Sequence, residues 1–486
     1  MKQGSLGGDA TKLTISKFVA LAISMLSAML LSRFRTYEEY GTYSQLLLIV
    51  NLITTIIMMG LPNSLNFFLS RAEDDEERAK FLSVYYTIST VLSFIVGLVL
   101  VLITPLIVAY FKNPLITNFI YFLAIFPWTK IICASIENVL VVYKKANYIM
   151  LFRILNSLSL LAIIILVEVC SWGFTAYMIL YLAVEVVFCL WVYILVKGFS
   201  KKLKILLDKD LIKSIFKFSI PIGLATMVGT LNAELDKLLI GSLMGTEQLA
   251  IYTNAAREMP LTIIASSITA VLLPQMARLL KERKNQEAIG LWSDATCLSF
   301  TIICFLSFAL VVFAPEVITI LYSEKYLAGA GVFRIYSLVL ILRCTYWGII
   351  LNSSGKTKAV FYSSLVTLLL NLVLNYAFFY CFGIVGPALA TLLSILIMTI
   401  CQLLLSSKIV KIKLKKLFDW KFIVASFLIN GIIAASFYCL AKLLPLDTLV
   451  GNVLEAIILG VIWTVVFVAV FIKPLKKKWE SLNKQR

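Results

Sequence analysis

The sequence predicts an all-α membrane protein that crosses the bilayer about fourteen times. Of its 486 residues, 61% are hydrophobic and 14% are charged, whereas soluble proteins average about 25% charged residues. Apolar runs recur along the whole chain, and about 20 such residues are enough for one helical crossing. The runs are continuous, so they differ from the alternating segments of about ten residues that a transmembrane β-barrel needs.

The apolar runs place the expected helices in chain order. A short polar stretch, residues 1–11, precedes a first span at about 14–33. No small-residue cleavage site follows this span, so we expect a retained helix and not a removed signal peptide. The remaining spans are expected near residues 44–69, 82–110, 116–142, 148–168, 173–196, 214–241, 248–277, 292–320, 328–352, 359–381, 384–407, 420–443 and 450–472.

The loops between the spans carry most of the positive charge. Fourteen spans place both termini on one side, where the loops hold 33 Lys and Arg residues against five in the opposite loops. Because Lys and Arg accumulate in cytoplasmic loops, we expect both termini in the cytoplasm. The same distribution explains the net charge of +18 through topology and lipid headgroups, so nucleic acid is not expected as a partner.

The composition excludes several kinds of chemistry. The chain has no histidine, which rules out His-based proton relays, His metal sites and Ser-His triads. Its nine cysteines are scattered, mostly inside spans, and none has a metal-binding spacing. We therefore expect no cofactor other than an ion that drives transport.

The chain contains an internal repeat. The stretch LSRFRTYEEYGTYS at 31–44 aligns with IGSLMGTEQLAIYT at 240–253, an offset of 209 residues. Pro62 and Pro274 continue this register at an offset of 212. Each repeat has six spans, an even number, so both repeats share one orientation in the membrane.

The repeat also sets the expected domain organisation. Two six-helix lobes are followed by two helices that lie outside the repeat. The expected parts are an N-lobe over 1–200, a cytoplasmic linker over 201–213, a C-lobe over 214–407, and two helices with a basic cytoplasmic tail over 420–486.

Ionisable residues gather in the mostly apolar stretch 218–274, which is long enough for two crossings. Glu234, Asp236, Lys237, Arg257 and Glu258 lie in this stretch at positions where lipid would reject charge. A charge at bilayer depth costs about 2.5–3.5 kcal/mol on insertion scales, so such groups face a protein interior or a watery cavity. The stretch therefore predicts two related lobes around a polar cavity.

Three stretches carry a resemblance to a known family. They read YEEYGTYS with GLPNSL, FSIPIGLATMVGTLNAELDKLLIGSLMGTEQLAIYTNAAREMP, and GIVGPALATLLSILI. The chain resembles the Wzx-type polysaccharide flippases of the MOP superfamily, which also contains the MATE exporters and the lipid II flippases. The resemblance covers spans one to twelve and extends to the total of fourteen.

This resemblance implies a fold and an activity. The fold would be MATE-like, with two six-helix lobes that open alternately to each side of the membrane. The activity would move an undecaprenyl-pyrophosphate-linked oligosaccharide, such as an O-antigen or capsule repeat unit, to the outer leaflet of the bacterial cytoplasmic membrane. No chemical bond would change, so the chain is not expected to be an enzyme. Polysaccharide polymerase and chain-length proteins are the expected protein partners.

Three intramembrane cations are candidates for binding the pyrophosphate. Lys130 and Arg343 are expected at the middle of spans four and ten, which are equivalent in the repeat, and Arg257 one to two turns into span eight. Arg suits phosphate through its planar fork, and Lys serves as a point charge. The alternative is an internal ion pair with an acid such as Glu137, Glu234 or Glu258. Glu234, Lys237 and Glu258 are further cavity candidates.

A second group of residues is a candidate site for a coupling ion. Asn371 and Asn375 share one face of span eleven, Thr391 lies in span twelve and Asp236 in span seven. Similar positions form a sodium site in a lipid II flippase, although Asn375 stands where that pattern has a second carboxylate. Interhelical hydrogen bonding is the structural alternative. A proton could instead use Asp236 or Glu234.

Other functions compete with this interpretation. A MATE-type exporter of organic cations would share the fold, but its cavity should be acidic, and three mid-membrane bases argue against it. A flippase for another polyprenyl-linked precursor, such as lipid II, is not separated by the sequence. A membrane glycosyltransferase or polymerase would need catalytic acids in a large outer loop, whereas the outer loops here are short.

Overall fold

The computed structural model describes residues 6–200, 202–257, 259–443 and 451–484. All regular structure in these residues is helical, as the sequence predicts. Thirteen described segments are long and apolar enough to cross a membrane. One of them, Thr357–Val410, contains two helices, α16 (Thr357–Phe382) and α17 (Gly386–Val410). Counting these two separately gives the fourteen predicted spans.

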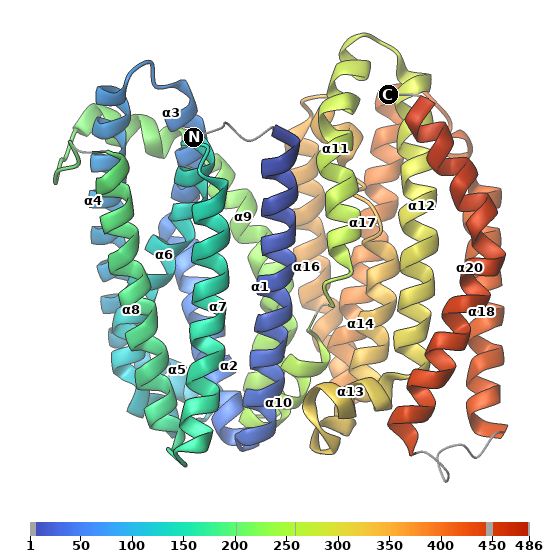
Figure 1. Ribbon diagram of the computed structural model, residues 1–486, viewed down its shortest axis with the longest axis horizontal. Helices are drawn as coiled ribbons and strands as arrows, with labels where there is room; N and C mark the ends of the chain where they lie inside the picture. Colours follow the sequence, from blue (N-terminus) through green and yellow to red (C-terminus); the bar gives the residue numbers. More distant parts are fainter. Residues whose placement is uncertain (1–5, 201, 258, 444–450, 485–486) are drawn as a thin grey trace. The chain divides into compact units, whose positions relative to one another are not determined.

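The chain divides into two compact units, Met1–Ala250 and Ile251–Arg486. Figure 1 labels the helices along the chain. The first unit contains α1 (Leu6–Phe34), α2 (Tyr37–Met58), η1 (Leu61–Asn63), α3 (Ser64–Arg71), α4 (Asp75–Leu102), α5 (Thr104–Phe111), η2 (Pro114–Phe119), α6 (Ile120–Val142), α7 (Ala146–Val169), α8 (Phe174–Phe199) and α9 (Lys209–Leu243), and α10 (Thr246–Ala255) crosses the boundary.

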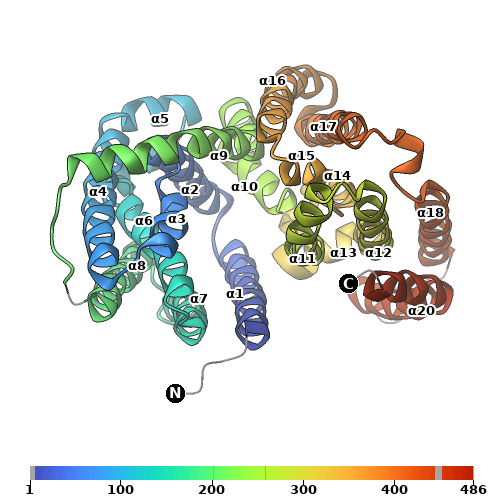
Figure 2. The same cartoon turned by 90° about the horizontal axis from the view of Figure 1, so that it is seen from above.

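The second unit begins within α10 and holds the rest of the chain. Besides α16 and α17 it contains α11 (Thr262–Lys281), α12 (Asn285–Val312), α13 (Ala314–Tyr322), η3 (Glu324–Gly329), α14 (Ala330–Leu342), α15 (Ile349–Ser353), η4 (Gly383–Val385), η5 (Leu414–Lys416), α18 (Trp420–Leu443) and α20 (Asn452–Lys484). In this unit α12 packs against α14 on one side and against α18 and α20 on another (Figure 2). The two helices outside the repeat therefore join this unit mainly through α12.

The internal repeat is visible in the helix boundaries. Four pairs of elements begin 210 residues apart. They are α4 and α12 at Asp75 and Asn285, α5 and α13 at Thr104 and Ala314, η2 and η3 at Pro114 and Glu324, and α6 and α14 at Ile120 and Ala330. The pair α7 and α16 begins 211 residues apart, at Ala146 and Thr357. The repeat is thus one of structure as well as of sequence.

Five spans that we predicted as continuous helices are broken. The span near 82–110 is interrupted at Ile103, between α4 and α5, and the span near 292–320 at Phe313, between α12 and α13. The span near 44–69 ends at Met58 and bends at Met59 and Gly60, both with positive φ, before η1 and α3. The span near 248–277 is interrupted between α10 and α11. The span near 328–352 is interrupted between α14 and α15.

Pro260 lies in the break between α10 and α11 and contributes to it. Proline has no N–H, so it removes the helical hydrogen bond to the carbonyl four residues earlier, and it disfavours helical geometry at the preceding residue. Pro127 and Pro221, by contrast, lie inside the continuous helices α6 and α9. A proline alone therefore does not decide where a span breaks.

Helix α9 belongs to the first unit, where it packs against α2. The two backbones touch at the bend after α2, since a Cβ on Gly223 would lie 2.2 Å from the carbonyl carbon of Met59. Our predicted boundary put this span in the C-lobe of residues 214–407, and that assignment stays a prediction. Residues 209–213 of the predicted linker are helical, because α9 begins at Lys209.

The start of α9 is tied to α4. The Asp208 carboxylate accepts hydrogen bonds from the backbone N–H groups of Asp210 and Leu211, 3.1 and 2.9 Å away, and so caps the helix. It also pairs with the Lys80 ammonium on α4 at 2.6 Å. The hydrogen bond from Lys80, together with the Leu211 N–H, lowers the pKa of Asp208 below its ordinary value.

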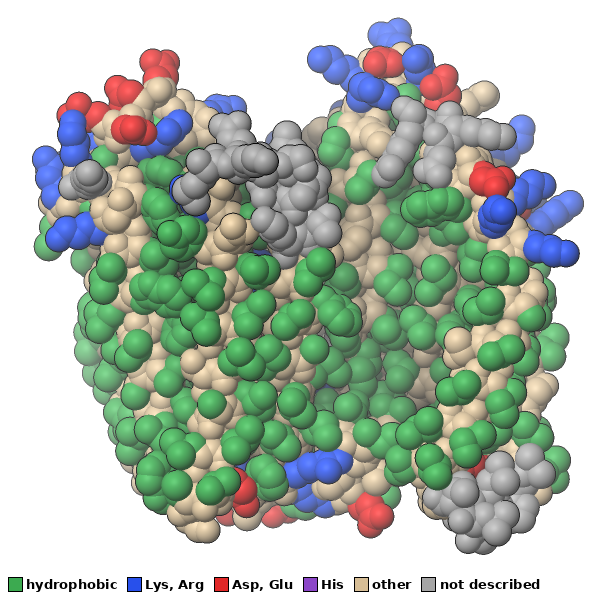
Figure 3. Space-filling model, in the orientation of Figure 1, with side chains coloured by type: hydrophobic (Ala, Val, Ile, Leu, Met, Phe, Trp, Pro, Cys, Tyr) green, Lys and Arg blue, Asp and Glu red, His purple; other side chains and the backbone are tan. Residues whose placement is uncertain are grey.

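The visible surface agrees with a membrane location for both units. Hydrophobic side chains cover the middle of the helices, and Lys, Arg, Asp and Glu gather at their ends (Figure 3). Large apolar side chains such as Leu106, Val187 and Ile194 are 62–69% exposed. Lipid is the solvent in which such exposure is favourable.

Candidate functional site

A polar network joins three membrane helices inside the first unit. On α6, the Lys130 ammonium donates to Oδ1 of Asn51 on α2 at 3.0 Å. The amide nitrogen of Asn51 donates to Oε1 of Glu234 on α9 at 3.4 Å. The second oxygen of Glu234 accepts from the Lys237 ammonium at 2.7 Å. Packing of α2 against both α6 and α9 brings these four side chains together.

Lys130 is the cation of this network that has spare hydrogen-bonding capacity. An ammonium has three N–H donors, and Asn51 is the one acceptor that Lys130 has among the described residues. The described residues place no carboxylate within ion-pair distance of it. Glu234, which we considered as its partner, is instead paired with Lys237, whose side chain is 22% exposed.

Glu137, another acid that we considered as a partner for the candidate cations, is paired with Arg153 instead. Its carboxylate accepts two hydrogen bonds from the Arg153 guanidinium on α7. Arg153 reaches further to the carbonyl of Leu13 and the hydroxyl of Ser16 on α1, at 3.3 and 3.4 Å. This arginine is therefore a structural group that holds α1, α6 and α7 together.

Asp236 lies on a different face of α9 from Glu234 and Lys237. Its side chain is buried, at 2% exposed, and one carboxylate oxygen accepts from the backbone N–H of Lys237 at 2.8 Å. Glu258, the remaining acid of the candidate set, lies outside the described residues.

An exposed amide pair lies beside this network, nearer the end of α6. The amide nitrogen of Asn66 on α3 donates to Oδ1 of Asn138 on α6 at 3.1 Å. Asn138 follows Lys130 by eight residues, which is about 12 Å along a helix. The first unit therefore presents a cation and an accessible amide pair along one helix.

We predicted Arg257 inside a helix, and this was wrong. The residue lies in the break between α10 and α11. It is half-buried, and its backbone N–H donates to the Asn254 carbonyl at 3.3 Å. Helix α10 ends at Ala255, so the helical geometry stops there. The residue thus sits where an interrupted membrane helix ends.

Arg343 also lies at a helix break and not at the middle of a continuous span. It is the C-terminal cap of α14, and its backbone N–H donates to the Leu340 carbonyl at 3.0 Å. The residues that follow are held in place by aromatic donors. The indole N–H of Trp292 donates to the Thr345 hydroxyl at 3.1 Å, and that of Trp347 to the Leu342 carbonyl at 2.5 Å.

Three of the four candidate coupling-ion residues lie on the packed pair α16 and α17. Asn371 and Asn375 are fully buried, and Thr391 is 5% exposed. The amide nitrogen of Asn375 donates to the Asn371 carbonyl at 2.8 Å and also to its side-chain oxygen. Oδ1 of Asn375 and the hydroxyls of Thr391 and Ser394 are buried without a hydrogen-bond partner among the described residues.

The fourth residue, Asp236, belongs to the first unit, so the four-residue site stays a prediction. The same holds for the shared cavity of Lys130, Arg257 and Arg343, since Lys130 lies in the first unit and the arginines in the second.

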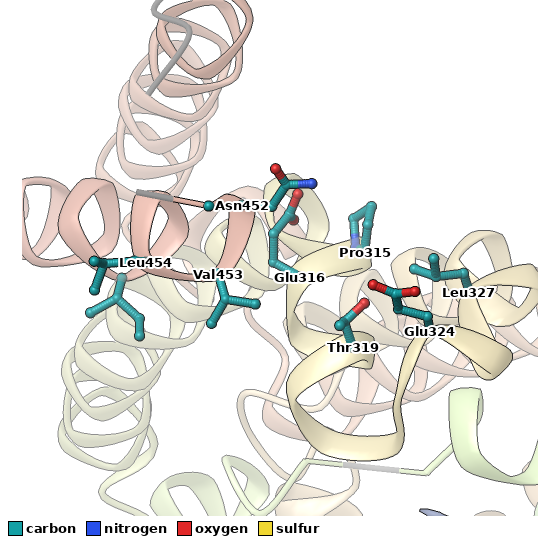
Figure 4. Close-up of a pocket in the computed structure, with 10 residues that line it drawn as sticks. Pro315, Glu316, Thr319, Glu324, Leu327, Asn452, Val453 and Leu454 are labelled. Carbon is teal, nitrogen blue, oxygen red and sulfur yellow. The ribbon is translucent and has the colours of Figure 1, made fainter. Parts of the chain in front are cut away.

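A pocket of about 430 Å³ lies at the end of the second unit near α13. Figure 4 shows Glu316 and Thr319 from α13, Glu324 from η3 and Asn452 from the start of α20 around it. Among the described residues, its lining holds two carboxylates and no Lys or Arg. An acidic pocket repels phosphate, so this pocket is not a candidate for the lipid-linked substrate.

Sequence reasoning missed two contributors to the site. Asn51 was not singled out, although an amide in the apolar run LLLIVNLITTIIM is the signal that could have found it. The pair Asn66 and Asn138 was missed because its members lie 72 residues apart and only the packing of α3 on α6 joins them.

The described spans, the six-span repeat and the ionisable residues within it define a polytopic membrane protein of the MurJ and MATE fold class. The chain is similar to the lipid II flippase MurJ in an inward closed conformation, with a TM-score of 0.75 and 18% identity, covering 95% of this chain and 99% of that one. It is also similar to an inward-facing multidrug resistance MATE family transporter of the MOP superfamily, with a TM-score of 0.68 and 15% identity, covering 83% and 99%.

The chain belongs to the polysaccharide biosynthesis protein family, whose model matches residues 30–330. An uncharacterized membrane protein of Methanocaldococcus jannaschii, MJ1068, is 25% identical over an alignment of length 485 that covers 93% of this chain and 92% of that protein. The "Probable low-salt glycan biosynthesis flippase Agl15" of Haloferax volcanii is 24% identical over 204 residues, 41% of this chain and 43% of that one. Together these similarities support a flippase kind of function.

Proposed function

We propose that this protein moves a polyprenyl-pyrophosphate-linked oligosaccharide, of the undecaprenyl type in bacteria, from the inner to the outer leaflet by alternating access. The family match and the flippase among the relatives support this substrate class. The MurJ-like fold supports the mode of action at the level of architecture. The protein acts as a transporter and not as an enzyme.

The observation that carries the proposal is the network around Lys130. A pyrophosphate and its sugars do not cross hydrocarbon unaided, so the path needs a cation for phosphate and neutral donors and acceptors for hydroxyl groups. Lys130 offers spare N–H donors inside the membrane-spanning part of the first unit. Asn138, about 12 Å further along α6, and its partner Asn66 on α3 offer accessible amides.

Arg257 and Arg343 are the proposed phosphate ligands of the second unit. Carbonyl groups at the end of a helix favour a nearby cation, and both arginines lie where a helix ends within a span. A guanidinium held there can bind a phosphate with two parallel hydrogen bonds. Glu234, Lys237 and Glu258 complete the proposed charged lining.

Transport of an accessible lipid-linked oligosaccharide in proteoliposomes tests the proposal, together with complementation of a flippase-null strain. Lys130→Ala should abolish most transport, whereas the exposed Lys408→Ala should not. Full transport by Lys130→Ala, Arg257→Ala and Arg343→Ala alike would refute the cation path. Export of organic cations without complementation would favour the MATE-type alternative, which the structural similarity also permits. Faster transport of lipid II than of the lipid-linked oligosaccharide would favour the remaining alternative, a lipid II-type flippase.

The coupling ion is proposed to be Na⁺ bound by Asp236, Asn371, Asn375 and Thr391. Hard cations take oxygen ligands. The buried oxygens of Asn375 and Thr391, which have no hydrogen-bond partner in the described part of the chain, fit this requirement. Asn375→Ala should remove a Na⁺ dependence of transport, whereas Thr367→Val on the same helix α16, whose hydroxyl already donates to the Ser363 carbonyl, should keep it. Transport that follows pH and ignores Na⁺ would point to a proton at Asp236 or Glu234.

We further propose that the protein resides in the cytoplasmic membrane with both termini inside, because of the charge bias in its loops. Cysteine labelling at the two termini in intact cells and in inverted vesicles tests this orientation. Polysaccharide polymerase and chain-length proteins are the proposed partners, and crosslinking from the cytoplasmic membrane would identify them.

A further inference from the structure

The connection between α17 and α18 is firmly held although only η5 in it is regular. The Ser407 hydroxyl donates to the Ile412 carbonyl at 2.6 Å, and the indole N–H of Trp420 donates to the Leu414 carbonyl at 3.0 Å. Leu417 and Phe418 are buried, and the Phe418 ring lies 4.6 Å from the ring of Trp292. The segment is thus a fixed part of the second unit.

The lysines of this connection face outward. Ile412, Leu414, Leu417 and Phe418 pack toward the core of the second unit. The exposed positions between them are the lysines Lys411, Lys413, Lys415 and Lys416. Because the apolar positions are anchored, the positive charges are presented in a fixed arrangement and not on a mobile loop.

A groove of about 600 Å³ lies between this connection and the first turns of α12. Three of the four lysines line it, together with the start of α12. The lining residues that matter here are Lys411, Lys413, Lys416, Gln286 and Ser293. Lys415 does not line the groove.

The groove has an excess of positive charge. Its one lining carboxylate, Asp419, already binds the Lys478 ammonium at 3.1 Å and the backbone N–H of Phe422 at 3.2 Å. The described residues provide no ion-pair partner for Lys411, Lys413 or Lys416. An anionic ligand would supply that partner.

The groove lies at the level of lipid headgroups. The span α17 ends at Val410, and the next span, α18, begins at Trp420. Both flanking helices expose apolar side chains further along, with Leu404 46% and Val424 52% exposed. Lysines next to the end of a span attract anionic lipids, and tryptophan is favoured at the same level.

We propose that this groove, formed by Lys411, Lys413 and Lys416 beside the start of α12, binds the phosphate headgroup of an anionic phospholipid. The loop charges place that lipid in the inner leaflet. The site is separate from the proposed substrate path and does not depend on it. A lipid bound there bridges α12, α17 and the connection to α18, so its binding stabilises the attachment of the two helices outside the repeat.

The test uses the purified full-length protein in nanodiscs of phosphatidylcholine with or without phosphatidylglycerol. The thermal unfolding temperature of the wild type should rise when phosphatidylglycerol is present. In Lys413→Gln/Lys416→Gln, affinity for this lipid should fall about tenfold or more, and most of the rise should disappear. The matched control Lys408→Gln/Lys415→Gln removes the same amount of charge outside the groove. In this control the rise in unfolding temperature with phosphatidylglycerol should remain.

Three outcomes would overturn the proposal. The groove variant could keep the full response to phosphatidylglycerol, the control could lose it equally, or inorganic phosphate could reproduce it in phosphatidylcholine discs. If the groove variant does not fold, acylation of wild-type lysines decides the matter. Phosphatidylglycerol should protect Lys413 and Lys416 from the reagent and leave Lys415 reactive, and equal labelling of all three in both discs would contradict the site.

Discussion

The two units carry equivalent spans that differ in continuity. In the first unit, α6 runs unbroken from Ile120 to Val142 past Lys130. Its repeat partner in the second unit ends at Leu342, and Arg343 caps the break before α15. Likewise α2 runs for 22 residues, Tyr37–Met58, before the bend at Met59, whereas its partner α10 stops after 10 residues at Ala255, near Arg257.

This difference shows two ways to keep a cation within the membrane. In the first unit the cation lies on an intact helix and is held by side chains of neighbouring helices, with Asn51 as its acceptor. In the second unit each arginine lies at an interrupted helix, near carbonyl groups that the helix no longer uses. The first arrangement depends on packing, and the second depends on the backbone break.

The largest effect should come from the backbone contact that supports the first arrangement. Gly223→Val should prevent accumulation of folded protein, because its Cβ would lie 2.2 Å from the Met59 carbonyl carbon and force α9 away from α2. The expected loss of stability is several kcal/mol, as for severe overpacking. Detergent-solubilised yield and size-exclusion profiles measure it. Gly229→Val, on the same helix, is the matched control, because a Cβ there would meet nothing within 4 Å beyond its own stretch of helix.

The next effect concerns the cation on the intact helix. Lys130→Ala should lower transport about 10- to 100-fold, since hydrogen bonds to a charged group contribute about 1.5–3 kcal/mol. Lys130→Arg should recover part of it, because the positive charge is retained. Proteoliposome flipping rates and the thermal unfolding temperature are the readouts. A large fall in unfolding temperature without a selective loss of transport would assign Lys130 a structural role.

Making the helix continuous across a break in the second unit should have an intermediate effect on transport. Pro260→Ala restores the missing N–H and should extend helix across the α10–α11 junction, which displaces Arg257. We expect transport to fall about tenfold, as misplaced binding groups typically cause, with little loss of folded protein. Pro221→Ala, inside the already continuous α9, should have a smaller effect on transport. Equal effects of the two substitutions would contradict the importance of the break.

A smaller effect is expected from the amide pair. Asn66→Leu and Asn138→Leu should each reduce transport about 2- to 10-fold, because each removes neutral hydrogen bonds of about 0.5–1.5 kcal/mol. The loss should grow with the number of sugars on the lipid carrier if the pair contacts sugar. Ser70→Ala, an exposed neighbour on α3, is the control. A loss independent of glycan length would remove the sugar contact.

The smallest effect concerns the start of α9. The pKa of Asp208 is lowered in the folded protein by Lys80 and the Leu211 N–H, so its stabilising contribution is present above the unfolded pKa of about 3.9. That contribution is lost as pH falls through the lower folded pKa. The difference in unfolding temperature between wild type and Asp208→Asn should therefore shrink as pH falls below about 4. A constant difference down to pH 3 would contradict the capping role.

Much of the fold was readable from the sequence because each span has to bury its own backbone polar groups in lipid. The fourteen spans and the repeat follow from that requirement. The breaks at Met59 and Arg343 were not predicted, because no proline directly precedes either of them. The break at Arg343 is stabilised by a tertiary contact, the hydrogen bond from Trp292 to Thr345, which no local pattern predicts. Pro260 alone does not predict a break, because Pro127 and Pro221 lie inside continuous helices.

Less of the site could be predicted. The charged residues were found because charge is rare in an apolar run, and Lys130, Glu234 and Lys237 do lie in one network. Their pairing was not predictable, since the i, i+3 contact between Glu234 and Lys237 competes with longer-range partners. Asn51 connects the network only through the packing of three helices, which no local pattern encodes.

The bonds from Arg153 to the Leu13 carbonyl and Ser16 hydroxyl have a practical consequence for building variants of the chain. A purification tag or fluorescent fusion placed ahead of Leu13 leaves these acceptors in place. Removing the chain through Ser16 would leave one nitrogen of the Arg153 guanidinium without these acceptors inside the membrane. Expression should fail from that position onward. The tolerable start of a shortened gene is therefore set by one side chain more than a hundred residues downstream.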